Sequence, residues 1–486
     1  MYGASVQGIQ GYIFQTNKLK DVIGASELVK DLCETDFKKK FVLTGNVEYI
    51  VKAAGNIKLI LDSEEDCRRI VFQFPKYAME KAPGITLSQA VVKCESDEQM
   101  ENARQELEES LRAQRNCPFK SLTLGSIAMH RSPLTGLPAI PGKDGEVLDE
   151  GVVRKREIVV RKREILDEND VNKTLFKIFT GEEVRYSEMG LEIRDLTGKN
   201  DWIAIIHADG NSLGDVVKAL GSESREKLCE FSNNLTEATK QAAQEAYREI
   251  KNEYEGKIDF KKPPIRPIVL GGDDLTVICR GDIAIDFVKK YLCKFESETG
   301  KLKLPSGKLT ACAGIAFIKS SYPFSFGYEL AETLCGLAKK DAKKDVIKDA
   351  NEGMVPSCLM FHKVQSSFVE DYESIKQKEL TLKDDSSLCY GPYYLTKQKD
   401  RWTIEELCNT ASEFAEDKYN SVKTSVREWL TKMHEDTEAA KQYSERVKAI
   451  SVNSELYECA TKESARKSYP AYDILSLVTI MNQKTR

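Results

Sequence analysis

Hydrophobic and polar positions follow the same order twice along the chain. In the first half the pattern predicts a strand over residues 4–14, a helical stretch over 19–41, a hairpin over 47–61, a helix over 64–82 and a strand over 85–93. In the second half it predicts a strand over 202–211, helical segments to about 254, a hairpin over 266–279, a helix over 282–295 and a strand over 309–318. Each half has the order βαββαβ, which predicts an α+β fold with two ferredoxin-like units.

The two hairpins also resemble each other in sequence. IVKAAGNIKLIL at 50–61 and IVLGGDDLTVIC at 268–279 both place Ile-Val before the turn and share the flanking apolar pattern. We interpret the halves as an internal duplication. Two unrelated split βαβ units are the alternative, since that architecture is common.

The segment between the halves has a different character. A charged helix is expected over 102–116, and a loop rich in Pro and Gly over 132–146. The heptapeptide VVRKREI then occurs in tandem at 152–158 and 159–165, and the pair carries a charge of +4. It is either a basic patch for RNA or DNA or a solvated linker or edge hairpin, and we favour the linker or hairpin.

The chain from about Trp402 is expected to form a small helical bundle. Two sets of apolar residues each recur at helical spacing. They are Ile404, Leu407, Cys408, Ala411 and Ala415, and then Val422, Val426, Trp429, Leu430 and Met433.

Composition narrows the class of protein. The 486 residues carry a formal net charge of −5, which argues against a surface that grips nucleic acid everywhere. The 13 cysteines are scattered without a CxxC pair, which is typical of reduced thiols, and we expect a cytoplasmic protein. We expect no signal peptide and no membrane span. The four histidines show neither zinc spacing nor a following Asp, so a His-based nuclease or a structural zinc is not expected.

Three carboxylates are the strongest chemical signal. Gly271-Gly272-Asp273-Asp274 lies in the second hairpin, where two glycines permit a tight turn and close approach of a phosphate. Asp209 ends the apolar strand IAIIHAD, and the βαββαβ order brings that strand end beside the hairpin. Asp209, Asp273 and Asp274 would then form a magnesium site for nucleoside triphosphate phosphates. Ordinary turn and helix-cap roles are the alternatives.

Two lysines follow on a later predicted helix, ELAETLCGLAKKDAKK. Lys339 and Lys343 are one turn apart and would reach a triphosphate as point charges. A solvated lysine face is an equally good interpretation.

Taken together, HADGNSLG, GGDDLTVIC and the stretch GIAFIKSSYPFSFGYELAETLCGLAKKDAKK resemble the second Palm domain of the polymerase-like large subunit of type III CRISPR systems. The opening SVQGIQGYIFQTNKLKDVIGASELV resembles the first Palm of the same family. The likeness covers about residues 4–95 and 200–365, and a more distant similarity is to GGDEF diguanylate cyclases. It implies a degenerate first Palm (1–98), a helical and charged linker region (99–199), a second Palm (200–365) and a helical C-terminal domain (366–486).

That family makes cyclic oligoadenylates from ATP with two divalent metal ions, Mg²⁺ or Mn²⁺. Carried over, the resemblance implies that Asp209, Asp273 and Asp274 bind metal and act in catalysis. It implies nucleotide contacts for Gly210, Asn211, Ser212, Gly271, Gly272 and Lys339. The implied partners are ATP, RNA or CRISPR complex subunits, a nucleotide-activated effector downstream and further copies of the chain.

The chain also departs from the family. It lacks the N-terminal His-Asp nuclease domain and the cysteines that sometimes bind zinc between the Palms, and it is short for a subunit that organises a guide-RNA complex. Similar proteins often carry a second acid two residues after the first Asp, where this chain has Asn211. The first half has no carboxylate at its strand end or hairpin turn, so we expect it to be an inert partner that holds the acceptor nucleotide. Ser26 is expected in a cap or packing role, and His207 beneath the site.

Three functions follow, in order of preference. The first is a nucleotidyl cyclase that makes a cyclic oligonucleotide messenger in antiviral defence. The second is a Palm-type scaffold that binds guide and target RNA without synthesis. The third is a template-directed polymerase, which ranks last because no long basic groove is evident.

Overall fold

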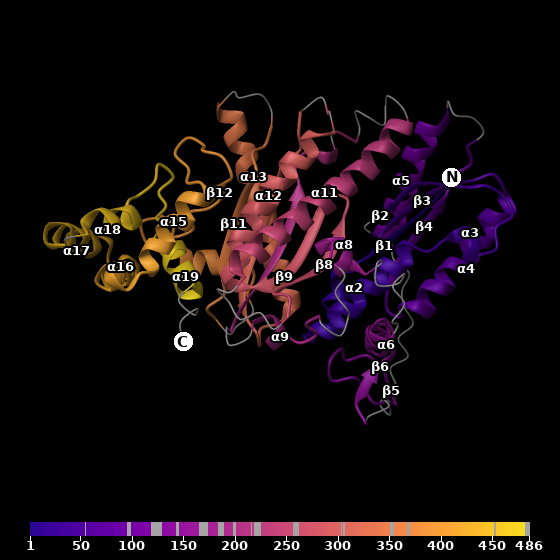
Figure 1. Cartoon of the computed structure of the whole chain (residues 1–486), viewed down its shortest axis with the longest axis horizontal. Coiled ribbons are helices and arrows are strands. Elements are labelled where there is room, and N and C mark those ends of the chain that lie inside the picture. The colour runs from indigo at the N-terminus through magenta and orange to yellow at the C-terminus, as the bar shows by residue number, and fades with distance from the viewer. Residues whose placement is uncertain are drawn as a thin grey trace.

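The computed structural model describes residues 1–53, 55–94, 99–117, 129–141, 145–164, 174–182, 189–197, 201–214, 216–217, 225–255, 262–302, 304, 307–349, 354–366, 370–451 and 453–481. The chain runs along the long axis of the molecule. The first sheet lies at one end, the second sheet in the middle and the C-terminal helices at the other end (Figure 1).

Residues of the first half form a four-stranded antiparallel sheet in the order β2-β3-β1-β4. The elements are β1 (Tyr2–Gln7), α1 (Ile9–Ile13), α2 (Leu19–Cys33), α3 (Phe37–Lys40), β2 (Val47–Ala53), β3 (Asn56–Leu61), α4 (Glu64–Lys81) and β4 (Thr86–Val91). Aromatic rings fill the space between sheet and helices, with Phe37 and Phe74 4.8 Å apart between ring centroids. The predicted hairpin is confirmed, although Ala54 in its turn lies outside the described residues.

The second sheet has six strands in the order β12-β11-β10-β7-β9-β8. Its strands are β7 (Trp202–Gly210), β8 (Ile265–Gly271), β9 (Asp274–Arg280), β10 (Ala311–Lys319), β11 (Cys358–Lys363) and β12 (Tyr393–Tyr394). The helices beside it are α11 (Arg225–Tyr254), α12 (Ala284–Gly300) and α13 (Phe324–Asp349), with the 3-10 turn η3 (Gly281–Ile283) between β9 and α12. The burial of β7 over its first seven residues fits its continuous apolar sequence.

Both halves share one strand order. Numbered within each half, β1 to β4 and β7 to β10 both run fourth-first-third-second across the sheet. The predicted α+β architecture with two ferredoxin-like units is confirmed, and β11 and β12 extend the second sheet beyond that core. A shared order is compatible with duplication and with two separate units alike, so the duplication stays a prediction.

The predicted strand over 4–14 is wrong in its second part. Gly8 has φ +60°, a left-handed conformation that ends β1, and α1 follows at once. The backbone N–H of Tyr12 donates to Gly8 O, and that of Phe14 donates to Gln10 O.

The central segment packs on both halves. It contains α5 (Met100–Asn116), β5 (Ala139–Pro141), β6 (Val147–Asp149), α6 (Glu150–Glu164), α8 (Leu175–Thr180) and α9 (Ile193–Thr197). Helices α5 and α6 lie against the first half, and α8 and α9 against the second. The charged helix is confirmed as α5. The predicted Pro- and Gly-rich loop contains the short antiparallel pair β5-β6.

The tandem VVRKREI is neither a solvated linker nor an edge hairpin. Its residues up to Glu164 lie in α6, which packs beside α2 (Figure 1). Lys155 is fully buried, and its Nζ donates to Tyr12 O at 2.8 Å and lies 4.1 Å from the centre of the Tyr12 ring. Lys162 Nζ lies 2.5 Å from Glu27 Oε2 on α2. These charges pair inside the protein, which is why the prediction of a linker was wrong.

α2 also joins the two halves. Ser26 is buried and its hydroxyl donates to the carbonyl of Ile268 in β8, so the expected packing role is what the structure shows. At Gly24 a Cβ atom would lie 1.9 Å from Lys155 O, so α2 and α6 approach as closely as they do only because this residue has no side chain.

The C-terminal region is helical, as predicted. Its helices are α14 (Tyr372–Ile375), α15 (Ile404–Ala415), α16 (Asn420–Glu435), α17 (Thr437–Ile450), α18 (Ser454–Thr461) and α19 (Ala471–Met481), with the short turns η4 (Lys376–Leu380) and η5 (Asp417–Tyr419). The capping box at Thr403 and Glu406 starts α15. Ile404, Leu407 and Ala411 are buried, as are Val422 and Val426.

Two expected absences concern only the part of the chain described above. There, none of the helices has the length and apolar character needed to cross a membrane. The described cysteines are all free thiols.

Candidate active site

The ends of β7 and β9 bring the acidic residues together. The antiparallel register pairs Ala208 with Leu275, so Asp209 and Asp274 lie opposite each other at the next step. A Cβ atom at Gly210 would lie 2.8 Å from Asp273 Oδ2 and 2.9 Å from Asp273 Cβ. The Asp273 side chain therefore packs directly on the backbone of Gly210, which only glycine permits.

The turn before Asp273 is tight and anchored from the side. Gly271 pairs with Asp274 across the hairpin, and Gly272 has φ +64°. The Thr239 hydroxyl, on α11, donates to Gly272 O at 2.7 Å. The space around the Cα of Gly272 is open, so its backbone is accessible to a ligand.

The carboxylates perturb one another. Burial raises the pKa of Asp274 to about 7, and the charges of Asp209 and Asp273 add to that effect. Burial and the neighbouring Asp209 likewise raise the pKa of Asp273. Carboxyl groups this close together bind a proton or a cation more tightly than isolated ones do.

Lys339 supplies the positive charge nearest to them. From α13 its Nζ donates to Asp209 Oδ2 and, at 2.7 Å, to the carbonyl of Gly210. Burial lowers the pKa of this ammonium group, but the hydrogen bond to Asp209, the charge of Asp209 and the neighbouring thiols of Cys335 and Cys312 together outweigh burial, so the net shift is upward. Lys343, one turn later, is exposed. The sequence allowed a phosphate contact for both lysines, but only Lys339 lies beside the carboxylates in the structure.

The fit of a metal ion rests on the donor chemistry. Asp273 and Asp274 offer hard oxygen ligands, and their pKa values are raised first by burial and then by neighbouring negative charge, which suits Mg²⁺ or Mn²⁺. Among the described residues, however, no three His, Cys, Asp or Glu side chains lie close enough to hold one ion together. Since Asp209 is engaged by Lys339, the three-carboxylate site stays a prediction.

The residues after Asp209 point in different directions. Asn211 is buried and its Nδ2 donates to Thr310 Oγ1 at 2.9 Å, whereas Ser212 is exposed with φ +58°. His207 lies beneath the site, with Nδ1 3.2 Å from Thr276 Oγ1, and burial lowers its pKa. The expected place of His207 is therefore confirmed.

A cavity of about 340 Å³ lies between the two halves and reaches Gly272 and Asp273. The second half contributes an apolar wall that includes Leu213, Phe231 and Leu235. The first half and α5 contribute the apolar residues Met1, Ile50 and Val51 and a polar wall of Asn56, Lys58, Arg104 and Glu108. This volume lies in the range of small-molecule binding sites.

No motif in the sequence predicted this polar wall. Lys58 lies on β3 and is ion-paired with Glu108 of α5. Neither belongs to a motif, and their meeting depends on α5 packing beside β1 and β4. The charged sequence of α5 predicted a helix but no contribution to a binding site.

Comparison with known proteins agrees with this architecture. Residues 202–348 match the family model of the second palm domain of Cas10/Cmr2. A crystal structure of an apo Csm1-Csm4 cassette is similar at 13% sequence identity and a TM-score of 0.61, over 100% of this chain and 70% of that chain. A Csm1-Csm4 cassette in complex with cA3 is similar at 14% identity and a TM-score of 0.59, over 100% of this chain and 69% of that chain. No curated protein matches the sequence.

Residues 202–348 thus match a palm domain of the Cas10/Cmr2 type, which confirms the resemblance drawn from the GGDD and HADGNSLG motifs. The whole chain has a fold similar to Csm1 and so resembles Cas10-like large subunits.

Proposed function

We propose that this protein is a nucleotidyl cyclase that joins ATP into a cyclic oligonucleotide messenger by two-metal catalysis, within antiviral CRISPR-like defence. The observation that carries the proposal is the meeting of Asp209, Asp273 and Asp274 at the edge of a cavity that both halves build. A packing role alone does not explain these carboxylates, because Asp273 and Asp274 repel each other and the nearby Lys339 is paired with Asp209.

Asp273 and Asp274, joined by Asp209, are the residues that would hold Mg²⁺ or Mn²⁺. Bound there, divalent metal would lower the pKa of an attacking ribose hydroxyl and stabilise the departing pyrophosphate. The open backbone of Gly272, next to Gly271, would face the phosphates of the donor nucleotide, and Lys339 would share its charge between Asp209 and the triphosphate.

The cavity would hold the acceptor nucleotide. Its apolar wall suits a base, and Lys58 and Arg104 suit phosphate oxygens. Holding the acceptor hydroxyl near the donor phosphate converts a bimolecular step into an intramolecular one. The first half would then act without a metal site of its own.

Relatives of the same fold support this assignment. Csm1-Csm4 cassettes have been crystallised with cA3, with pppApA and with one ATP. By the same likeness, the partners we propose are ATP, a Csm4-like subunit, RNA and a downstream effector that senses the product.

The test is product analysis with purified protein. Each labelled nucleoside triphosphate is incubated with Mg²⁺ or Mn²⁺, with and without RNA, and the products are resolved by chromatography. We expect a cyclic product from ATP that is lost in Asp273→Ala. Absence of any product with and without RNA, from protein that binds ATP and Mn²⁺, would rule out the cyclase.

A second candidate is a scaffold subunit that binds guide and target RNA without synthesis. It is favoured by the engagement of Asp209 with Lys339 and by the similarity to a Csm1-Csm4 subcomplex of the type III-A CRISPR-Csm interference complex. Tight RNA binding without any nucleotide product would establish it.

A further inference from the structure

Asn211 follows the catalytic strand end directly, yet its side chain turns into the protein. We propose that Asn211 and Thr310 are a positioning pair that fixes the end of β7, and with it Asp209 and the Gly210 backbone. The proposal rests on the proposed function of Asp209. The sequence predicted that Asn211 contacts the nucleotide. We instead assign it the role of holding Asp209 and Gly210 in position.

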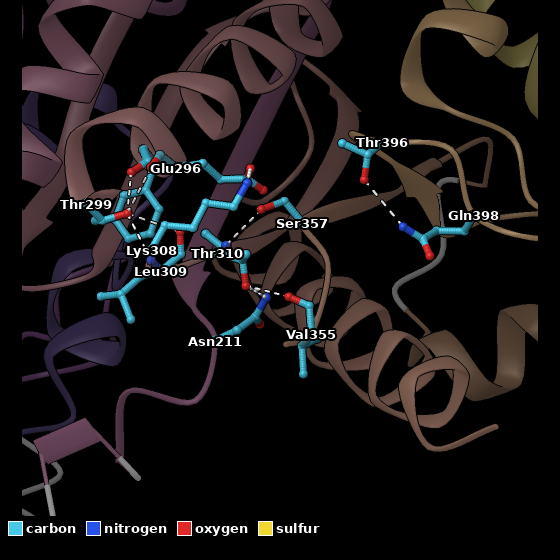
Figure 2. Close-up of polar contacts among 12 residues, drawn as sticks. Asn211, Glu296, Thr299, Lys308, Leu309, Thr310, Val355, Ser357, Thr396 and Gln398 are labelled. Atoms are coloured by element: carbon cyan, nitrogen blue, oxygen red, sulfur yellow. Dashed lines mark hydrogen bonds and ion pairs between the residues drawn. The ribbon is translucent and has the colours of Figure 1, made fainter. Parts of the chain in front are cut away.

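The pair is held by two parallel bonds. The backbone N–H of Asn211 donates to Thr310 O at 2.8 Å, and Asn211 Nδ2 donates to Thr310 Oγ1 at 2.9 Å (Figure 2). Both side chains are nearly inaccessible, with 3% and 4% of their residue surface exposed. Hydrogen bonds in such surroundings are costly to break, because water cannot replace the lost partner.

Thr310 is itself fixed from the other side. Its hydroxyl donates to Val355 O at 2.5 Å, and the next amide, Ala311 N–H, donates to Ser357 Oγ at 3.1 Å (Figure 2). Val355 and Ser357 lead into β11, which pairs in parallel with β10. The hydroxyl therefore links the end of β7 to two further strands of the sheet.

The backbone around Asp209 needs such an anchor. Gly210 has no side chain, and Ser212 adopts a left-handed conformation that L-residues rarely occupy. Besides the strand ladder and the Asn211–Thr310 pair, the described residues hold this segment through Lys339 Nζ, on Asp209 Oδ2 and Gly210 O, and through Val216 N–H on Ser212 O at 3.4 Å. A displacement of this short segment would move the Asp209 carboxylate and the surface on which Asp273 packs.

The chemistry of the pair also explains why residue 211 is an amide. Since the Thr310 proton is committed to Val355 O, Thr310 Oγ1 can only accept from residue 211. Asn211 Nδ2 donates, whereas an aspartate there would bring a buried charge against an acceptor. Asn211 Oδ1 has no hydrogen-bond partner among the described residues. An amide therefore suits this position better than a second acid does.

The test compares Thr310→Val, which removes the hydroxyl, with Thr310→Ser, which keeps it. Two readouts do not depend on activity. One is hydrogen–deuterium exchange of the amides at 210–212, and the other is the Mn²⁺ concentration that half-saturates the protein, followed by electron paramagnetic resonance. We expect Thr310→Val to speed exchange and raise the Mn²⁺ midpoint by about tenfold, as for the loss of a buried hydrogen bond. Thr310→Ser should stay within twofold of the parent.

Asn211→Ala gives a second arm if Thr310→Val fails to fold, because it leaves the bond from Thr310 to Val355 intact. Asn211→Ala should show the same faster amide exchange and the same higher Mn²⁺ midpoint. The factor by which kcat falls should exceed the factor by which the KM for ATP rises. Asn211→Asp should bind Mn²⁺ more weakly than the parent.

Unchanged exchange and Mn²⁺ binding in a folded Asn211→Ala protein, or tighter Mn²⁺ binding in Asn211→Asp, would overturn the proposal. If the parent protein makes no nucleotide product, the cyclase proposal fails. The amide-exchange and Mn²⁺-binding data still test whether Asn211 and Thr310 hold the end of β7 in position.

Discussion

The two halves place the same structural elements around opposite chemistry. In each, the end of the first strand lies beside the turn of the hairpin formed by the second and third strands. In the first half that junction is apolar, since a Cβ at Gly55 would lie 2.3 Å from Ile9 Cδ1 and 3.5 Å from Val6 Cβ. In the second half the corresponding contact is between Gly210 and the Asp273 carboxylate. The fold supplies the meeting point, and the side chains decide whether it can bind a cation.

The inert half still contributes to the shared cavity. Asn56 and Lys58 follow its hairpin turn and line the wall opposite Asp273. The Ser5 hydroxyl donates to Asn56 Oδ1 at 2.8 Å and so holds that side chain in place. Under the proposed function, this half would present the second substrate although it has no metal ligands of its own.

The largest expected effect comes from removing one carboxylate of the second half. Asp273→Asn should lower the rate of nucleotide synthesis by about 10³-fold, because metal-based stabilisation of the transition state amounts to several kcal/mol. The measurement is product formed under saturating ATP and Mg²⁺.

The matched control lies in the first half. Asp36 caps α3, and Asn caps a helix equally well, so Asp36→Asn should keep full activity. Equal losses in both variants would contradict the division of labour between the halves.

A smaller effect, on the KM for ATP, is expected from replacing Lys339. Lys339→Gln removes the charge beside Asp209 and should raise the KM for ATP about tenfold, as for the loss of one charge-assisted hydrogen bond. Lys343→Gln, on the exposed side of the same helix, should leave KM unchanged. Steady-state kinetics at fixed free Mg²⁺ separates the two lysines, and parity between them would remove Lys339 from the site.

The next effect is the part of the pH dependence of stability that comes from Asp273 and Asp274 in the second half; Asp473, whose pKa burial also raises to about 7, contributes equally to parent and variant. The raised pKa values of Asp273 and Asp274 mean that the folded state binds protons more tightly than the unfolded chain. Without metal, the melting temperature should fall as pH rises from about 4 to about 7, and this cost is fully present above pH 7. Asp274→Asn should remove part of the fall, a few degrees, and Mg²⁺ should reverse it in the parent protein.

Calorimetry in EDTA across this pH range measures the difference between parent and variant. Identical pH profiles would show that the carboxylates are not held together in solution.

The smallest effect concerns the contact that joins the halves. Ser26→Ala removes the hydroxyl that donates to Ile268 O and should cost about 1 kcal/mol of unfolding free energy. Ser421→Ala, at an exposed position of α16, should cost nothing measurable. Denaturant titration of both variants compares them directly, and a neutral Ser26→Ala would mean that the halves are held together elsewhere.

The sequence predicted the parts of the fold that depend on local periodicity. The apolar runs before Asp209 and around Gly271-Gly272 identified β7, β8 and β9, and the strand order followed from the repeated βαββαβ pattern. The approach of Asp209 to the hairpin could be inferred because ferredoxin-like connectivity places those elements side by side.

What the sequence could not provide depends on contacts between distant elements. The inward turn of Asn211 depends on Thr310 and on Val355, which lie 99 and 144 positions further along the chain. Lys339 was distinguished from Lys343 only by the way α13 lies on β7 and β10. The left-handed Gly8 that ends β1 has no signal beyond the identity of the residue.

The length of the tandem heptapeptide is a signal for a helix with one buried face. Seven residues make nearly two turns of an α-helix, so equivalent positions of the two copies stay within about 20° of each other. Lys155 and Lys162 both contact the first half for this reason, and Val152 and Val159 are both buried. Gain of one further copy would lengthen α6 by about 10 Å without rotating its contact surface. An insertion of two residues would swing the buried lysine by about 200° into solvent, so natural length variants of this helix should differ in multiples of seven.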